Sequence, residues 1–232
     1  METEATHARP GAAALAEHLP MIPPRYMPFA HLAGAPLIGA AVLALCLLNV
    51  ETFGWIGLAT VALTLVYSNL VEWLAHRGLL HRRRRFWEVL YDRHVPMHHM
   101  IYRHGSMAVT CRREWFFVLM PARGVLGIVV LAIPLALALG KLIGPDVGWI
   151  FLTTAGLYAV SYELLHLCYH LRSDVWVMRI PLLGGVLRAL SRHHARHHHV
   201  ELMQKWNFNV TVPLWDFLLR THYPRHKPLP EP

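Results

Sequence analysis

The stretch Val147 to His170, VGWIFLTTAGLYAVSYELLHLCYH, is apolar along most of its length and ends in two histidines four residues apart. A helix crosses the hydrocarbon core of a membrane with about 20 apolar residues, so this stretch predicts a membrane helix. Ionisable groups are costly inside a membrane and are seldom kept there without a role. The stretch therefore predicts a membrane protein with a polar site at one end of this helix.

The whole chain has the composition of a membrane protein. It has 232 residues, of which 55% are hydrophobic and 16% are charged, with a mean hydropathy of +0.33. An ordinary soluble domain carries about 25% charged residues. Three further apolar runs lie near residues 33–50, 53–76 and 115–144. We predict an all-α membrane protein with four transmembrane helices in two hairpins, a cytosolic histidine-rich cap and an interfacial helix.

The basic residues indicate which helix ends face the cytosol. The formal net charge is +8, and arginines crowd the connection between the second and third runs, whereas the two short turns carry only Glu51, Lys141 and Asp146. By the positive-inside rule, the arginine-rich connection, both termini and everything after His170 are expected in the cytosol. Arginines beside helix ends meet anionic lipid headgroups there, so the positive charge does not call for a nucleic-acid partner.

The segments outside the four runs have simpler predicted roles. Residues 1–30 lack the basic region and apolar core of a signal peptide, and we predict a disordered cytosolic leader followed by a single membrane-embedded domain over residues 31–232. Arg, Pro and Gly interrupt residues 175–190, which we expect to lie in the membrane interface. The alternative is a fifth crossing, which the arginines disfavour. The three cysteines lack paired spacing, so neither disulfides nor a thiolate metal site is indicated.

Ten of the eighteen histidines form four clusters with short internal spacings. The clusters are His76 and His81; His94, His98 and His99; His166 and His170; and His194, His197 and His198. Residues four apart share a helix face, so His166 with His170, and likewise His94 with His98, can point at one ion. His76 and His81 are five apart, so their segment must unwind or bulge for both to converge, which Gly78 makes easier.

All four clusters are expected on one side of the membrane, where two antiparallel hairpins bring them together. Ten imidazoles exceed the six ligands of octahedral coordination and suit two ions with about five nitrogens each. Imidazole ligands alone suit Zn, Cu, Fe or Ni, and the spacing does not choose among them. The register of the last cluster is open, with His193 and His199 as alternates. These two histidines are otherwise interpreted as surface residues, together with His104, His222 and His226.

Two glutamates and three tyrosines accompany the histidine-bearing helices. Glu72 and Glu163 each lie within four residues of a clustered histidine. Each of them either accepts a ring N–H from a histidine or caps a helix end among the headgroups. Tyr67, Tyr158 and Tyr162 either line a route for a lipid or are ordinary packing aromatics, which is the more common role.

In the order and spacing of its clusters, the sequence resembles the fatty acid hydroxylase and sterol desaturase superfamily, whose members are integral-membrane, histidine-rich di-metal oxygenases. The resemblance covers residues 71–221 and includes the closing stretch WNFNVTVPLWDFLLRT, residues 206–221. It implies metal ligation by all ten clustered histidines, with no catalytic side chain beyond these ligands. The histidines are His76, His81, His94, His98, His99, His166, His170, His194, His197 and His198.

The resemblance also implies an activity. The expected enzyme is a non-haem di-iron lipid hydroxylase, an oxidoreductase of the monooxygenase type, with two iron ions that zinc can replace in purified protein and with O2 as co-substrate. A redox metal suits this reaction because side-chain acids and bases do not cleave unreactive C–H bonds. The expected partners are a membrane lipid substrate and a separate electron donor, either a cytochrome b5, a ferredoxin or a reductase. A desaturase using the same site and a non-catalytic membrane metal-binding protein are the alternatives.

Overall fold

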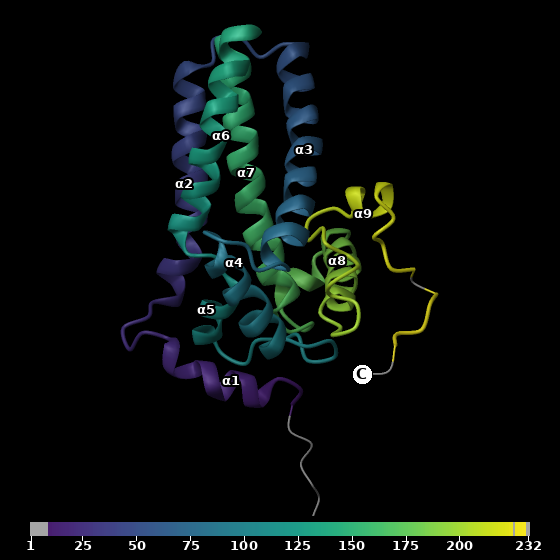
Figure 1. Cartoon of the computed structure of the whole chain (residues 1–232). Helices are drawn as coiled ribbons and strands as arrows, with labels where there is room; N and C mark the ends of the chain where they lie inside the picture. Colours follow the sequence, from purple (N-terminus) through teal and green to yellow (C-terminus); the bar gives the residue numbers. More distant parts are fainter. Residues whose placement is uncertain (1–8, 225, 231–232) are drawn as a thin grey trace, which may run out of the picture.

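The computed structural model describes residues 9–224 and 226–230, and this part of the chain contains helices and turns but no β-strand. Four of its helices are long and apolar enough to cross a membrane, and they run alongside one another in Figure 1. They are α2 (Pro28–Asn49), α3 (Trp55–Ala75), α6 (Ala122–Leu142) and α7 (Pro145–Tyr169). The prediction of an all-α membrane protein with four candidate spans is confirmed.

The central helix of this bundle is α7, which packs against α2, α3 and α6. Half (50%) of the most apolar 18-residue stretch of α7 is buried, whereas only 22% of the corresponding stretch of α2 is buried. Small residues allow α7 to approach α6 closely. A Cβ atom on Gly148 would lie only 2.6 Å from the carbonyl oxygen of Ala136 in α6. The histidines that end α7 are therefore carried into the middle of the molecule.

The first two spans are joined by a short loop but pack mainly on α7 and not on each other. Asp146 at the start of α7 holds this loop, because its carboxylate accepts the backbone N–H groups of Glu51 and Thr52 at 3.1 Å each. The Thr52 hydroxyl donates to the same carboxylate at 2.7 Å. By contrast, α6 and α7 pack directly on each other. The two predicted hairpins thus differ in how closely their helices approach.

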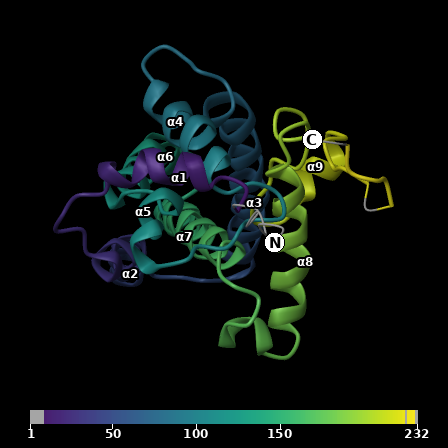
Figure 2. The same cartoon turned by 90° about the horizontal axis from the view of Figure 1, so that it is seen from below.

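Short elements gather at one end of the four long helices and form a cap (Figures 1 and 2). They are η2 (His76–Leu80), α4 (Glu88–Arg93), η3 (His94–His99), η4 (Arg112–Glu114), α5 (Trp115–Val118), η5 (Trp176–Arg179), α8 (Leu183–His197) and α9 (Leu214–Leu218). A buried cluster that includes Ile101, Tyr102, Phe117 and Leu119 packs against Leu167 near the end of α7. This core joins the cap to the bundle.

The N-terminal segment differs from the predicted disordered leader. Residues 1–8 lie outside the described residues, but α1 (Ala12–His18) and η1 (Leu19–Met21) are folded. Ile22 is buried in the cap core, and Leu15 packs against it. These few apolar side chains are buried by tertiary contacts that the Pro- and Ala-rich composition does not reveal. The segment is therefore ordered from α1 onward.

The stretch predicted to lie in the interface divides at Leu182, which has a φ of 62°, into η5 and α8. The 15 residues of α8 are fewer than the roughly 20 that a crossing needs, so α8 is not among the candidate spans. Leu183 and Val186 are exposed on this helix, whereas Leu187 is buried. Exposed apolar groups at this spacing suit the predicted interfacial position.

Candidate metal centre

The ten clustered histidines lie together in the cap, all of them buried, and form two groups of five within the described residues. In each group the five ligand atoms lie within 4.8 Å of one another. The first group is His76, His81, His94, His99 and His197, and the second is His98, His166, His170, His194 and His198. The structure thus brings together every histidine that the sequence proposed as a ligand.

Two π-helical turns direct histidines five residues apart to the same side. In η2 the backbone N–H of His81 donates to the carbonyl of His76 at 3.0 Å, and both rings belong to the first group. This is the bulge that the spacing predicted. A second π-helical turn, η3, brings His94 and His99 together in the same group. His98 then falls in the second group, so the expectation that His94 and His98 share an ion is wrong, because it assumed α-helical spacing.

Histidines four residues apart on regular helices supply most of the second group. His166 and His170 stand at the end of α7, and His194 and His198 at the end of α8. On an α-helix such pairs point the same way. His197 lies one residue before His198 and belongs to the first group, so α8 contributes to both.

His193 and His199, the alternates for the last cluster, belong to neither group and contact other side chains. His193 pairs with Asp216 through Nε2 and Oδ2 at 3.1 Å. The ring centroid of His199 lies 5.8 Å from that of His104. In this structure the register with His194, His197 and His198 is the one that converges. His193 and His199 are nevertheless buried, so their interpretation as surface residues is wrong.

The outer nitrogen of five of these rings is held by a backbone carbonyl. A carbonyl can only accept, so Nδ1 carries the proton and the lone pair lies on the inward-facing Nε2. The N···O distances are 3.0, 2.9 and 2.8 Å for His98, His170 and His197. The five pairs are His76 with Phe208, His98 with Phe117, His170 with Met107, His197 with Trp206 and His198 with Tyr102.

The inner ring nitrogens present lone pairs that a cation could bind. In His98 and His170 the proton lies on Nδ1, so Nε2 carries a lone pair. Both Nε2 atoms are buried and have no hydrogen-bond partner among the described residues. In the first group, Nε2 of His81 and Nε2 of His197 approach to 2.9 Å. Buried acceptors are almost always satisfied, and converging imidazole lone pairs suit a transition metal. The residues therefore fit a pair of metal ions.

Burial keeps the cap imidazoles neutral. It lowers the pKa of His170 and of His197 to about 4. Burial, followed by neighbouring histidines, also lowers the pKa of His81, His94 and His99. Neutral imidazole is the form that binds a metal ion. The centre is thus in its metal-binding protonation state at neutral pH.

Glu72 and Glu163 hold backbone rather than histidine rings. The Glu72 carboxylate accepts the backbone N–H groups of Val210 and Thr211, the latter at 3.1 Å. The Glu163 carboxylate accepts the backbone N–H of Met120 at 2.7 Å. A ring N–H contact was one of the two alternatives predicted for these glutamates, but the outer ring nitrogens that are held donate to backbone carbonyls of the cap. The two glutamates instead anchor the C-terminal segment and the start of α6.

Sequence reasoning missed Asp216, which organises the segment after the last histidine cluster. Its carboxylate accepts the backbone N–H groups of Phe208 at 2.9 Å and Asn209 at 2.8 Å, and the Thr221 hydroxyl at 2.7 Å. This segment provides the carbonyls that hold His76 and His197. The only sequence signal was the place of Asp216 within residues 206–221.

A cavity of about 210 Å³ reaches the histidines and is called the histidine cavity below. His94, His98 and His166 line it, so it meets both groups. Most of its other lining is apolar, including Leu80, Leu90 and the α5–α6 connection, and its charged residues are Arg93, Arg123 and Glu163. The apolar walls of this cavity therefore border the candidate metal ligands directly.

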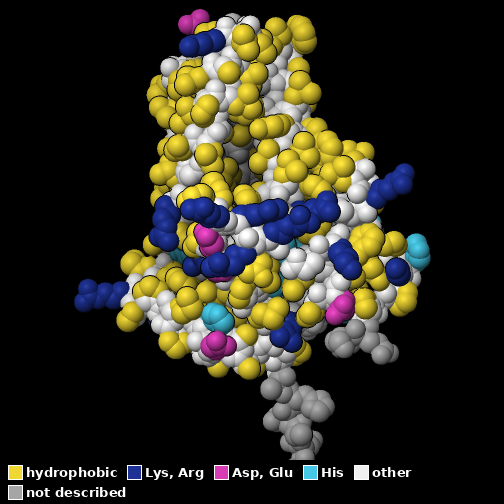
Figure 3. All heavy atoms as spheres, viewed as in Figure 1, with side chains coloured by type: hydrophobic (Ala, Val, Ile, Leu, Met, Phe, Trp, Pro, Cys, Tyr) yellow, Lys and Arg dark blue, Asp and Glu magenta, His cyan; other side chains and the backbone are white. Residues whose placement is uncertain are grey.

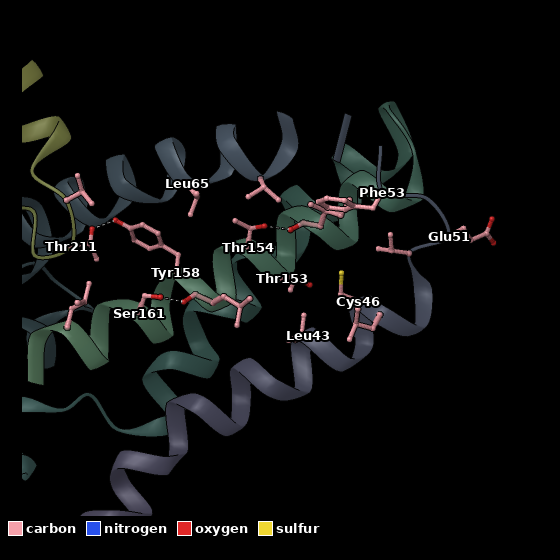
Figure 4. A pocket seen from close by; sticks show the side chains of 17 residues that line it. Leu43, Cys46, Glu51, Phe53, Leu65, Thr153, Thr154, Tyr158, Ser161 and Thr211 are labelled. Carbon is pink, nitrogen blue, oxygen red and sulfur yellow. Dashed lines mark hydrogen bonds between the residues drawn. The ribbon is translucent and has the colours of Figure 1, made fainter. Parts of the chain in front are cut away.

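A larger groove of about 700 Å³ lies between α2, α3 and α7, and no histidine is among its lining residues in the described chain. Figure 4 shows Tyr158 near one end of this groove, beside Thr211. The other tyrosines lie elsewhere: Tyr162 lines the histidine cavity, and the ring of Tyr67 lies 6.0 Å from that of Phe151. Of these two cavities, only the smaller one is lined by the clustered histidines.

Comparisons with known proteins agree with this arrangement. Residues 61–221 match a family model described as fatty acid hydroxylase. A search of curated proteins finds no match. Among solved structures, the chain resembles one described as full-length Scs7p with only its hydroxylase domain visible, with a TM-score of 0.54 and 16% identity, over 96% of this chain and 70% of that one. At this identity the likeness shows a shared fold.

Proposed function

The chain belongs to the fatty acid hydroxylase family, and from this membership we propose that it hydroxylates a lipid C–H bond with O2 at a centre of two iron ions. The family makes it an oxidoreductase that hydroxylates lipids, and its histidine groups can hold metal ions. The observation that carries the proposal is the convergence of ten buried histidines in two groups of five.

Each group of five would hold one ion through its inward-facing nitrogens. Bound iron would supply the redox chemistry that activates O2 toward an unreactive C–H bond, which no side chain of the protein can supply. The protein's own part is to hold and orient. Backbone carbonyls fix the protons on Nδ1 of five rings, and the rings of Tyr102 and Phe208 pack against the histidines.

The histidine cavity would hold the reacting segment of the lipid. Its apolar lining suits methylene groups, and it places them beside His94, His98 and His166. We further propose that the centre lies on the cytosolic side, where a separate cytochrome b5, ferredoxin or reductase delivers electrons. The arginine-rich connection between α3 and α6 supports this orientation.

The test combines metal content with product analysis on protein purified in lipid nanodiscs. We expect about two irons per chain by elemental analysis, since about five nitrogens suit each ion. We also expect O2 uptake with a reductant and a membrane lipid extract, and a product heavier by one oxygen atom. His98→Ala should abolish the product, whereas His226→Ala, at an exposed position, should not.

Other results would contradict the proposal in identifiable ways. A product lighter by two hydrogen atoms would indicate a desaturase at the same centre. Bound metal without O2 uptake under any reductant would indicate a metal-binding protein. Equal activity of the His98→Ala and His226→Ala variants would remove the histidine groups from the reaction.

A further inference from the structure

The lining of the histidine cavity carries positive charge that the proposed chemistry does not use. Arg93 and Arg123 line the cavity together with a single carboxylate, that of Glu163. The Glu163 carboxylate already accepts the backbone N–H of Met120. Within the described lining, two guanidinium groups therefore stand beside one carboxylate, and the remaining walls are mostly apolar or histidine.

The two arginines reach the cavity from different elements. Arg93 ends α4, where Nη2 donates to the Phe116 carbonyl at 2.9 Å and the guanidinium lies 5.1 Å from the Phe116 ring centroid. Arg123 stands in the first turn of α6 and is exposed, and within the described chain it has no hydrogen bond or ion pair. Arg93 is thus fixed in place, while the guanidinium of Arg123 remains available to a ligand.

The electrostatic environment between them favours an anion. The positive charges of Arg93 and Arg123 interact at this cavity, and the Glu163 carboxylate offsets part of the charge on Arg93. An anion that binds both guanidinium groups would relieve the repulsion between their like charges. Guanidinium groups bind carboxylates and phosphates through charge-assisted and often bidentate hydrogen bonds. The first turn of α6 adds the positive end of its helix dipole.

The position also matches the depth of a lipid headgroup. Figure 3 shows Lys and Arg side chains in a band across the base of the long helices, with hydrophobic side chains above it. Such a band lies at the level of the lipid phosphates. Arg123 begins the spanning helix α6, so a headgroup bound there would stay near its ordinary depth in the membrane.

We propose that the substrate lipid carries an anionic carboxylate or phosphate headgroup, which Arg123 and Arg93 bind at the histidine cavity. Its acyl chain then lies along the cavity toward His94, His98 and His166. The inference rests on the proposed function of the same site and adds the class of substrate to it. Arg123 is the residue that determines specificity for charge.

The test measures lipid binding without turnover. Full-length protein in phosphatidylcholine nanodiscs, with no reductant, is loaded with a fluorescent fatty acid that palmitic acid, palmityl phosphate or methyl palmitate then displaces. We expect both anionic lipids to displace it at about tenfold lower concentration than methyl palmitate. Whichever of the two is the stronger competitor identifies the headgroup as carboxylate or phosphate.

Variants separate this site from general surface charge. Arg123→Gln should weaken both anionic competitors about tenfold and leave methyl palmitate unchanged, and Arg123→Lys should restore part of the loss. Arg85→Gln is the matched control, because Arg85 is an exposed arginine whose guanidinium lies 4.8 Å from the Phe86 ring centroid, outside the cavity lining. This control should bind all three lipids as the unmodified protein does.

Two results would overturn the inference. One is displacement by methyl palmitate as effective as that by the anionic lipids, and the other is an equal loss in the Arg123→Gln and Arg85→Gln variants. A product assay on the same preparations separates the two proposals. Charge-dependent binding without hydroxylated product would contradict the proposed function alone, whereas hydroxylated product without charge preference would contradict the headgroup site alone.

Discussion

Asp216 holds more of the backbone around the centre than any ligand does. The residue is fully buried and accepts two backbone N–H groups, one hydroxyl and one imidazole. The backbone it holds includes Phe208, whose carbonyl takes the Nδ1–H of His76. One carboxylate outside the centre thus orients a ring within it.

Asp216→Asn should weaken both the fold and the centre. An amide nitrogen would replace one acceptor oxygen and face buried donors, which costs about 1–3 kcal/mol for an unsatisfied group. We expect a lower melting temperature in detergent and an iron affinity reduced about 10–100-fold, as for groups that orient metal ligands. Asp174→Asn is the control, because Asp174 forms an exposed pair with Arg172 at 3.0 Å. Equal melting temperatures for the two variants would contradict this role for Asp216.

The identity of the clustered histidines could be predicted at the residue scale, but their partners could not. Spacing selected the histidines of the first three clusters, because short spacings on helices direct side chains together, and it left the register of the last cluster open. The outer nitrogens, however, bind backbone carbonyls, and a carbonyl has no sequence signature. The partners of Glu72 could not be predicted for the same reason, since Val210 and Thr211 lie far along the chain.

At the scale of elements, the π-helical turns determine which histidine joins which group. The five-residue spacing of His76 and His81 predicted a bulge, because an α-helix does not bring residues five apart to one face. The bulge at η3 was hidden, since His94 and His98 have an acceptable α-helical spacing. Two groups of about five could be predicted from the number of histidines, but which histidine belongs to which group could not.

Inserting one alanine after Gly78 should remove a metal ion. His76 and His81 would then be six residues apart, which places them about 240° apart on an α-helix at 3.6 residues per turn. We expect elemental analysis to give about one iron per chain in place of about two, because the second group needs neither residue.

The matched control inserts one alanine after Arg84, in the exposed connection between His81 and α4. Flexible surface connections tolerate added length at small cost. This control should keep both irons. Full iron content in both insertion variants would show that the π-helical turn is not required to form the first group.

For the whole molecule, the number of spans could be predicted and their packing could not. Each apolar run has the length that the hydrocarbon core requires, so the runs identify the spans one by one. Which spans touch depends on surface shape, and small residues such as Gly148 permit the close contact of α6 with α7. The groove between α2 and α3 could not be predicted from the hydropathy of the sequence either.

The orientation in the membrane is testable with single cysteines. Cys111, the exposed cysteine, is first replaced by serine, and cysteine is then introduced at Glu51 or at Arg84, both of which are exposed. By the positive-inside rule, a membrane-impermeant thiol reagent should label Glu51→Cys on intact cells and Arg84→Cys only after lysis. The reverse pattern would place the histidine cap outside the cytosol.

The interleaving of the two histidine groups also sets an order in time. Both groups draw members from η3 and from the end of α8, so neither is complete until the ribosome has passed residues 197 and 198. By then all four candidate spans have been made. His76 and His81 are synthesised first, and His197 of the same group follows only after α6 and α7 have been made. A complete group of five histidines, able to hold a metal ion, therefore exists only after all four candidate spans have been made.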